Sequence, residues 1–302
     1  MKLSVVIPTY NRRDTLIETL KAFSRQSYKN FEIIIVDDGS TDGTEEVVKG
    51  INLSLKIKYI FQQNKGPASA RNLGIKQAKN EIIFFTGDDI IPSENLLEEH
   101  INIHRTANEN ISVLGYTKWA PQIRITPFRK YITDYHFAYP SINDENNVDW
   151  GYFYTSNVSI RKKFLEKTEL FDEEFPYAAY EDSELGYRLF KNGMRTVFNK
   201  KAVAYHNHPI NFKSYQKTMF NKGQSSIILA QKIPALEYKS KYKETKNPIR
   251  LFFKKLIFSK PIMFLTTEII CFLDKLLIPL PKIIYVKILD YYRVQGIKKA
   301  TK

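Results

Sequence analysis

The sequence predicts an α/β fold with a doubly wound, mainly parallel sheet flanked by helices, and a basic amphipathic helical extension at its C-terminal end. Apolar segments alternate with amphipathic ones three times before a fourth apolar segment, which is the order that right-handed strand–helix–strand units produce. The apolar segments are rich in β-branched residues, as expected for strands covered on both faces. Two of them end in adjacent acidic residues, at 37–38 and 88–89.

The first four strands are expected at residues 3–7, 31–36, 56–61 and 82–86. Apolar residues at helical spacing predict helices at 16–23 and 67–78, and a short helix is expected after Thr44. Asp14 is the candidate N-cap of the first helix. Pro92 is expected to prevent the fourth strand from continuing, because proline has no N–H to donate.

The order of elements after the fourth strand is less regular. The predicted elements are a helix at 96–104, a strand at 111–119, a helix from 180 that Gly193 closes, and a short strand at 203–205. Residues 121–150 are irregular and aromatic, which favours an ordered functional loop over disorder. His100 and His104 lie four residues apart, but a half-buried helix face explains them better than a metal site.

Charge divides the chain near Asn211. Basic and acidic side chains balance over residues 1–211, so the whole excess of +14 lies in residues 212–302. Cys271 is the one cysteine, which excludes an intramolecular disulfide. The apolar run after Lys2 ends at Pro8 and is too short for a secretory signal. Together these features favour a cytoplasmic protein.

The two acidic pairs define the candidate site. The carboxyl ends of parallel strands meet at one edge of a sheet, and open α/β sheets bind ligands at that edge. Paired carboxylates suit Mg²⁺ or Mn²⁺ bridging a diphosphate. A solvated turn would explain Asp88 and Asp89 alone, but two acidic loops at one edge favour a nucleotide-diphosphate site. Glu181 and Asp182 open a predicted helix, where acids also compensate the helix dipole.

In this order the motifs resemble family 2 glycosyltransferases of the GT-A fold, over about residues 3–210. The matching segments are Ser4–Asn11, Val36–Asp42, Asn64–Asn72, Asp88–Asp89, Asn157 with its flanks, and Glu181–Leu189. The resemblance implies an inverting transfer of a sugar from a nucleotide-diphosphate sugar, a UDP-sugar foremost, to a glycan or lipid-linked acceptor. It implies a role in polysaccharide biosynthesis. The donor residues it implies are Pro8, Tyr10, Asp37, Asp38, Asn64, Arg71 and Asp88.

The resemblance also implies a divalent cation, Mn²⁺ or Mg²⁺. Asp88 and Asp89 occupy the metal motif Asp-x-Asp, in which Gly87 replaces the first acid, so one ligand is missing or shifted. Asp89 is expected to bind directly. His206 falls at the position of a further metal ligand, with His208 as the alternative and a surface histidine as the plain explanation.

Asp182 falls at the position of the catalytic base, which takes the proton of the acceptor hydroxyl. Glu181 could nominally serve as the nucleophile of a retaining reaction, and the family resemblance argues against it. Trp150 and Asn157 are the candidate acceptor residues. Arg188 is expected to form a structural ion pair.

The organisation that follows is a glycosyltransferase domain at 1–211, with a nucleotide-binding half at 1–92 and an acceptor half at 93–211, and an extension at 212–302. Residues 250–302 form basic amphipathic segments in which no apolar run reaches the roughly 18 residues that span a bilayer. They predict a peripheral contact with the anionic inner face of a membrane. A packed helical subdomain or a dimer surface is the alternative.

Two other functions are compatible with parts of the sequence. A nucleotidyltransferase would open with a glycine-rich phosphate loop, whereas Pro8 to Arg12 follow the first strand here. A catalytically weak or inactive relative would act as a scaffold through its basic tail. Nucleic acid is the less favoured partner, because the tail is strongly aliphatic.

Overall fold

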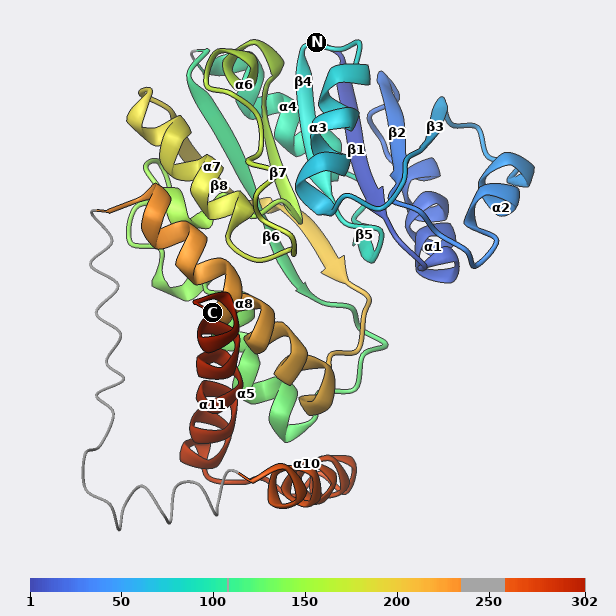
Figure 1. Ribbon diagram of the computed structural model, residues 1–302. Coiled ribbons are helices and arrows are strands. Elements are labelled where there is room, and N and C mark those ends of the chain that lie inside the picture. The colour runs from blue at the N-terminus through green and yellow to red at the C-terminus, as the bar shows by residue number, and fades with distance from the viewer. Residues whose placement is uncertain (108, 235–258, 302) are drawn as a thin grey trace. The chain divides into compact units, whose positions relative to one another are not determined.

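The computed structural model describes residues 1–107, 109–234 and 259–301 (Figure 1). The chain divides into two compact units. The first comprises Met1–Ile123 and Phe137–His208, and the second comprises Arg124–His136 and Pro209–Lys302. The second unit therefore takes a segment from within the predicted aromatic loop.

An eight-stranded mixed sheet forms the centre of the first unit. Its strands are β1 (Leu3–Thr9), β2 (Phe31–Asp37), β3 (Ile57–Phe61), β4 (Ile82–Thr86), β5 (Ile90–Pro92), β6 (Ile111–Trp119), β7 (Asn157–Arg161) and β8 (Arg195–His206). Their order is β3-β2-β1-β4-β7-β6-β8-β5. The strands β3, β2, β1 and β4 are parallel, β7 is antiparallel to both of its neighbours, and β5 is antiparallel to β8. The predicted fold class is confirmed.

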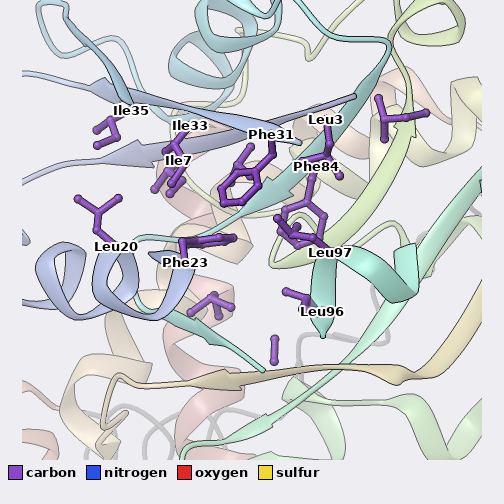
Figure 2. Packing of buried hydrophobic residues seen from close by; sticks show 14 of the residues in the cluster. Leu3, Ile7, Leu20, Phe23, Phe31, Ile33, Ile35, Phe84, Leu96 and Leu97 are labelled. Atoms are coloured by element: carbon purple, nitrogen blue, oxygen red, sulfur yellow. The ribbon is translucent and has the colours of Figure 1, made fainter. Parts of the chain in front are cut away.

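Helices cover both faces of this sheet. They are α1 (Arg13–Ser24), α2 (Thr44–Gly50), α3 (Pro67–Gln77), α4 (Leu96–Thr106), α6 (Lys162–Lys167) and α7 (Glu181–Lys191), with short 3-10 turns η1 (Tyr139–Ser141) and η2 (Trp150–Tyr152). Alternate residues of β1 point to opposite faces: Val5 packs with the apolar face of α1 and α4, and Val6 with that of α3, α6 and α7. Figure 2 shows the buried cluster between the sheet and helices α1 and α4, in which Phe23 and Leu97 pack toward the strands.

One expected boundary is wrong and one is right. Asp14 is not the N-cap, because α1 begins at Arg13 and the side chain of Asp42 accepts the N–H of Arg13 from the neighbouring loop. The fourth strand does not continue through Pro92, as expected: β4 ends at Thr86, the chain turns into the short strand β5 at the sheet edge, and Pro92 is the last residue of β5.

Two other expected elements are incomplete. Residues 121–150 contain α5 (Pro127–His136), whose Phe128 and Ile132 are buried. The strand expected at 203–205 is part of β8, which is 12 residues long and has exposed lysines at 200 and 201 beside a register shift. These two lysines interrupt the apolar pattern, so the sequence predicts only the last part of the strand.

The second unit is helical and contains α5, α8 (Phe212–Lys232), α10 (Lys260–Lys275) and α11 (Lys282–Ala300). The helices α8 and α11 touch through their backbones: a Cβ added at Gly223 would lie 2.0 Å from the carbonyl oxygen of Arg293. One added at Gly296 would lie 1.9 Å from that of Phe220. Within the described ranges, no helix is long and apolar enough to cross a membrane.

Candidate active site

The first acidic pair follows β2 and is fully engaged in hydrogen bonds. The carboxylate of Asp38 accepts the backbone N–H groups of Lys65 and Gly66, both at 2.9 Å, and the amide of Gln62 at 2.7 Å. Asp37 accepts the N–H of Ser40 through Oδ1, and its Oδ2 accepts the hydroxyl of Tyr59, both at 2.7 Å. Asp38 therefore fixes the loop that leads into α3. Asp37 fixes the turn after β2.

Three other predicted donor residues lie at this edge. Pro8 is half-buried near the end of β1, and Tyr10, just beyond the strand, is 49% exposed. Asn64 is exposed, and its backbone lies beside Gly39, whose added Cβ would be 3.0 Å from the N–H nitrogen of Asn64. Since Thr9 pairs with Asp37 across β1 and β2, these residues lie at one sheet edge.

The second acidic pair lies in the turn between β4 and β5. Arg12 donates from Nη1 to Asp88 Oδ1 at 3.2 Å and to Asp89 Oδ2, and Thr9 donates to Asp88 Oδ2 at 2.8 Å. The backbone of the turn is held as well, because Thr19 donates to the carbonyl of Asp88 and the N–H of Asn207 donates to that of Asp89. The sequence did not predict Arg12 in this contact.

His206 ends β8 beside this pair, with Nε2 3.8 Å from Asp89 Oδ2. Its ring packs edge-on against Trp119, and the His208 ring centroid lies 6.5 Å from that of His206. Two carboxylates and an imidazole are ligands that suit Mn²⁺. The described residues contain no set of three or more His, Cys, Asp or Glu side chains arranged to hold a metal ion. Here Arg12 contacts the carboxylate oxygens that a cation would need.

Burial and charge separate the ionisation of the two aspartates. Burial, together with the neighbouring Asp89 charge, raises the pKa of Asp88 to about 7. Burial also acts to raise the pKa of Asp89, but the adjacent His206 and Arg12 lower it below its usual range. Burial lowers the pKa of His206, and the guanidinium of Arg12 is the permanent positive charge beside the pair.

The third acidic pair opens α7, and its two members differ. Glu181 is 2% exposed and its Oε1 accepts from Arg71 Nη1 at 2.8 Å, while its Oε2 is buried with no hydrogen-bond partner among the described residues. Burial raises the pKa of Glu181 to about 7. Asp182 is half-buried and accepts the N–H of Ser183 at 2.8 Å. Tyr180, before them, has a positive φ of 72°, a strained conformation for a non-glycine residue.

Trp150 lies against the helix that carries Asp182. An added Cβ at Gly186 would lie 2.4 Å from the carbonyl oxygen of Trp150, so only glycine permits this approach of α7 to η2. The Trp150 and Tyr187 rings meet edge-on at 5.3 Å. This contact fixes an aromatic pair one turn along α7 from Asp182.

Asn157 lies inside the protein. Its side chain is fully buried, donates to the carbonyl of Ala202 at 3.0 Å and bonds to His100 Nε2 at 2.9 Å. His100 and His104 both contact the hydroxyl of Ser159. The two histidines are therefore part of a buried polar network, in agreement with the helix-face explanation.

The predicted ion pair of Arg188 is confirmed. Its guanidinium contacts both carboxylate oxygens of Glu184, at 2.7 and 2.8 Å, and also donates to backbone carbonyls at 168–170. Arg71, by contrast, is 8% exposed and its charge faces Glu181 and the ring of Phe171.

A mixed sheet with helices on both faces, and acidic turns after the two parallel strands that flank β1, is the architecture of the GT-A class. Residues 4–169, more than half of the chain, match the sequence profile described as Glycosyl transferase family 2. The chain therefore belongs to glycosyl transferase family 2, and the predicted family is confirmed.

Curated relatives include chondroitin synthase of Escherichia coli, which is 28% identical over 265 residues, covering 77% of this chain and 38% of that protein. Validoxylamine A glucosyltransferase of Streptomyces hygroscopicus subsp. jinggangensis is 29% identical over 235 residues, covering 66% of this chain and 54% of that protein. The chain thus spans well under two thirds of the length of these relatives.

Two solved structures share the fold. TarS of S. aureus in complex with UDP has a TM-score of 0.56 and 19% identity, covering 100% of this chain and 92% of that one. The mannosyltransferase PcManGT from Pyrobaculum calidifontis, in complex with GDP-Man and Mn²⁺, has a TM-score of 0.62 and 17% identity, covering 99% and 87%.

Proposed function

We propose that this chain transfers a sugar from a nucleotide-diphosphate sugar, a UDP-sugar foremost, to a hydroxyl of a glycan or lipid-linked acceptor with inversion. The observation that carries the proposal is the placement of acidic turns after β2 and β4, on either side of β1. Open α/β sheets bind nucleotides at such an edge. The UDP complex of TarS and the GDP-Man complex of PcManGT support a nucleotide-sugar donor.

A divalent cation belongs to the proposal, and Asp88, Asp89 and His206 would hold it. Two carboxylates and one imidazole fit Mn²⁺, and the Mn²⁺ complex of PcManGT supports this choice of ion. When bound, the ion would supply positive charge to the diphosphate as it leaves. Gly87 contributes no ligand, and a Cβ there would lie 2.8 Å from Asp89 Oδ1, so its small size leaves room for that carboxylate.

Asp182 is the proposed general base. The acceptor oxygen forms a bond to the anomeric carbon, the bond from that carbon to the diphosphate oxygen breaks, and the hydroxyl proton passes to the Asp182 carboxylate. Glu181 is an unsuitable nucleophile, because Arg71 holds one of its oxygens and only 2% of the residue is exposed. The division between a sealed Glu181 and a half-buried Asp182 supports inversion over retention.

Trp150 is the proposed acceptor contact, together with Tyr187. Aromatic rings present flat apolar surfaces that pack against sugar rings, and this pair is fixed to the helix of the base. Asn157 supports the site from inside the sheet, because its buried amide links β7, α4 and β8.

The decisive measurement is release of nucleoside diphosphate from a panel of UDP- and GDP-sugars with Mn²⁺, comparing Asp182→Asn with the unsubstituted protein. Loss of a base is expected to reduce turnover by about 10²–10⁴-fold with donor binding retained. Glu174→Gln, which alters an exposed acid on the preceding segment, is the matched control and should leave turnover unchanged. Equal, near-zero turnover in all three proteins with intact donor binding would favour the catalytically inactive scaffold instead.

The proposal includes a peripheral contact with an anionic membrane, through the part of residues 250–302 that the structure describes. Helix α10 buries Thr267 and Asp274, which bond to Gln216 and to the N–H of Phe128. Its opposite side is apolar and exposed. We call this surface the α10 ridge; it comprises Ile262, Phe264, Leu265, Ile269, Phe272 and Leu276.

Two observations favour a lipid surface as the occupant of the α10 ridge. Exposed apolar residues continue into the next turn and helix as Leu277, Ile278 and Ile283, which makes a patch of the kind that marks an interaction site. The exposed lysines 275, 282 and 287 flank this patch, and the third of the chain that contains it has the whole net charge of +14. Apolar insertion flanked by cations suits an anionic leaflet.

Co-sedimentation of the full chain with phosphatidylglycerol-containing vesicles tests this contact. The unsubstituted protein should bind them and not pure phosphatidylcholine vesicles, and Leu265→Ser with Phe272→Ser should reduce binding at least about tenfold. Phe190→Ser, which removes an exposed aromatic residue from the first unit, is the control. Self-association that the double variant abolishes, without vesicle binding, would identify a second copy as the occupant and reject the membrane.

A further inference from the structure

Arg12 contacts the carboxylates of both Asp88 and Asp89. Two adjacent carboxylates, only 8% and 12% exposed, repel one another unless a cation lies between them. Arg12 is that cation, because its always-charged guanidinium contacts both carboxylates. It contacts Asp89 Oδ2, the same oxygen that faces His206 at 3.8 Å.

A guanidinium and a divalent ion need the same lone pairs of these carboxylates. A hydrogen bond places nitrogen near 2.9 Å from oxygen, whereas Mn²⁺-sized ions bind oxygen at roughly 2.1 Å. The guanidinium and the ion therefore cannot both occupy the same lone pair of one carboxylate oxygen. Binding of the ion through Asp89 Oδ2, which faces both His206 and Arg12, and through Asp88 Oδ1 therefore displaces Arg12 from these two oxygens.

The surroundings of Arg12 allow the side chain to leave while the backbone stays. The preceding residue, Asn11, is fixed at both ends: its N–H donates to Ser40 Oγ, and its Oδ1 accepts the N–H of Thr41 at 2.8 Å. The Arg12 side chain is 40% exposed, so it can move into solvent without unfolding the turn.

We propose that Arg12 is a built-in competitor of the divalent cation. It neutralises the Asp88–Asp89 pair in the cation-free protein and is displaced when the ion binds. The cation-free site is thereby kept folded, at the expense of cation affinity. This inference rests on the proposed function, because it takes these residues as the cation site.

Mn²⁺ binding to donor-free protein, followed by the paramagnetic resonance signal of the free ion, tests the competition. Arg12→Gln removes the competing charge and is expected to bind Mn²⁺ about tenfold more tightly than the unsubstituted protein. Arg12→Lys, whose ammonium lacks the planar fork, should lie between the two. Arg13→Gln is the matched control, since the Arg13 side chain bonds to Asp14 and to the carbonyl of Asp42, away from the pair.

Thermal melting supplies a second readout that activity does not affect. In EDTA, Arg12→Gln should melt at a lower temperature than Arg13→Gln, and saturating Mn²⁺ should raise its melting temperature by more than it raises that of the unsubstituted protein. Should Arg12→Gln fail to fold, the same comparison is made with Arg12→Lys.

Unchanged or weaker Mn²⁺ binding in Arg12→Gln and Arg12→Lys would overturn the competition. Turnover of a nucleotide sugar in EDTA, with no Mn²⁺ bound by any variant, would also overturn it while leaving the transferase function in place. Tight Mn²⁺ binding that strengthens on removal of Arg12, in a protein without turnover, would support the competition and reject the transferase.

Discussion

Two carboxylate–arginine contacts in the first unit differ in their access to solvent. Arg71 is on α3 and contacts one carboxylate, that of Glu181, with side chains that are 9% and 3% exposed. Arg12 is on the turn after β1 and bridges Asp88 and Asp89, with its own side chain 40% exposed. The first contact is sealed within the protein, and the second opens to the surface.

The difference in solvent exposure determines whether the arginine can be released from its carboxylate partner. A sealed pair cannot release one partner, because the remaining charge would be buried without compensation. An open pair can exchange its arginine for water or for another cation. In both places burial raises the pKa of one acid to about 7, so the pKa of the acid alone does not distinguish the two sites.

Breaking the sealed pair is expected to have the largest effect on stability. Arg71→Met leaves Glu181 buried without its partner and should reduce the free energy of unfolding at pH 7 by about 3–5 kcal/mol. Urea denaturation measures the loss. The double variant Arg71→Met, Glu181→Met should recover most of it, because it removes both charges; a double variant as unstable as the single one would contradict the sealed-pair assignment.

The pH dependence of the sealed pair gives an intermediate effect. Burial raises the folded-state pKa of Glu181 from 4.5 to about 7, so between these values the native protein binds a proton that the unfolded chain has released. The stability of the unsubstituted protein relative to Glu181→Gln should therefore fall as the pH rises from about 5 to 7, and then level off. Urea midpoints at several pH values measure it, and a relative gain over that window would refute it.

An ion pair at the surface is expected to have the smallest effect on stability. Lys49 and Glu45 lie one turn apart on α2, with side chains 66% and 43% exposed. Lys49→Gln should change the free energy of unfolding by about 0.5 kcal/mol or less, because solvent screens both charges. A loss as large as that of Arg71→Met would mean that solvent exposure does not determine how much each ion pair contributes to the free energy of unfolding.

Local sequence patterns predicted the strands and the acidic turns because both depend on neighbouring residues. Uniform apolar segments such as 31–36 become buried strands, and acids at their ends must lie at the sheet edge. Arg12 was missed because its contacts are with residues more than 70 positions away, and nothing in the local sequence separates it from the neighbouring Arg13.

Tertiary context also explains the elements that were missed. The apolar side of α5 faces helices that lie far along the chain, since Phe128 packs on Phe212 and Tyr285. Its sequence shows an aromatic run without a strong helical signal. β5 has three residues and includes Pro92, so only its pairing with β8 makes it a strand.

Helix α3 links two parts of the site that are far apart in sequence. The N–H of Gly66, immediately before α3, is held by Asp38, and the side chain of Arg71 holds Glu181, the residue before Asp182. Asn72 adds bonds to the carbonyl of Phe171 and to Glu173. A shift of this one helix along the sheet would carry the loop that Asp38 holds and the first turn of α7 in the same direction, so the distance between the proposed donor residues and the proposed base would be preserved.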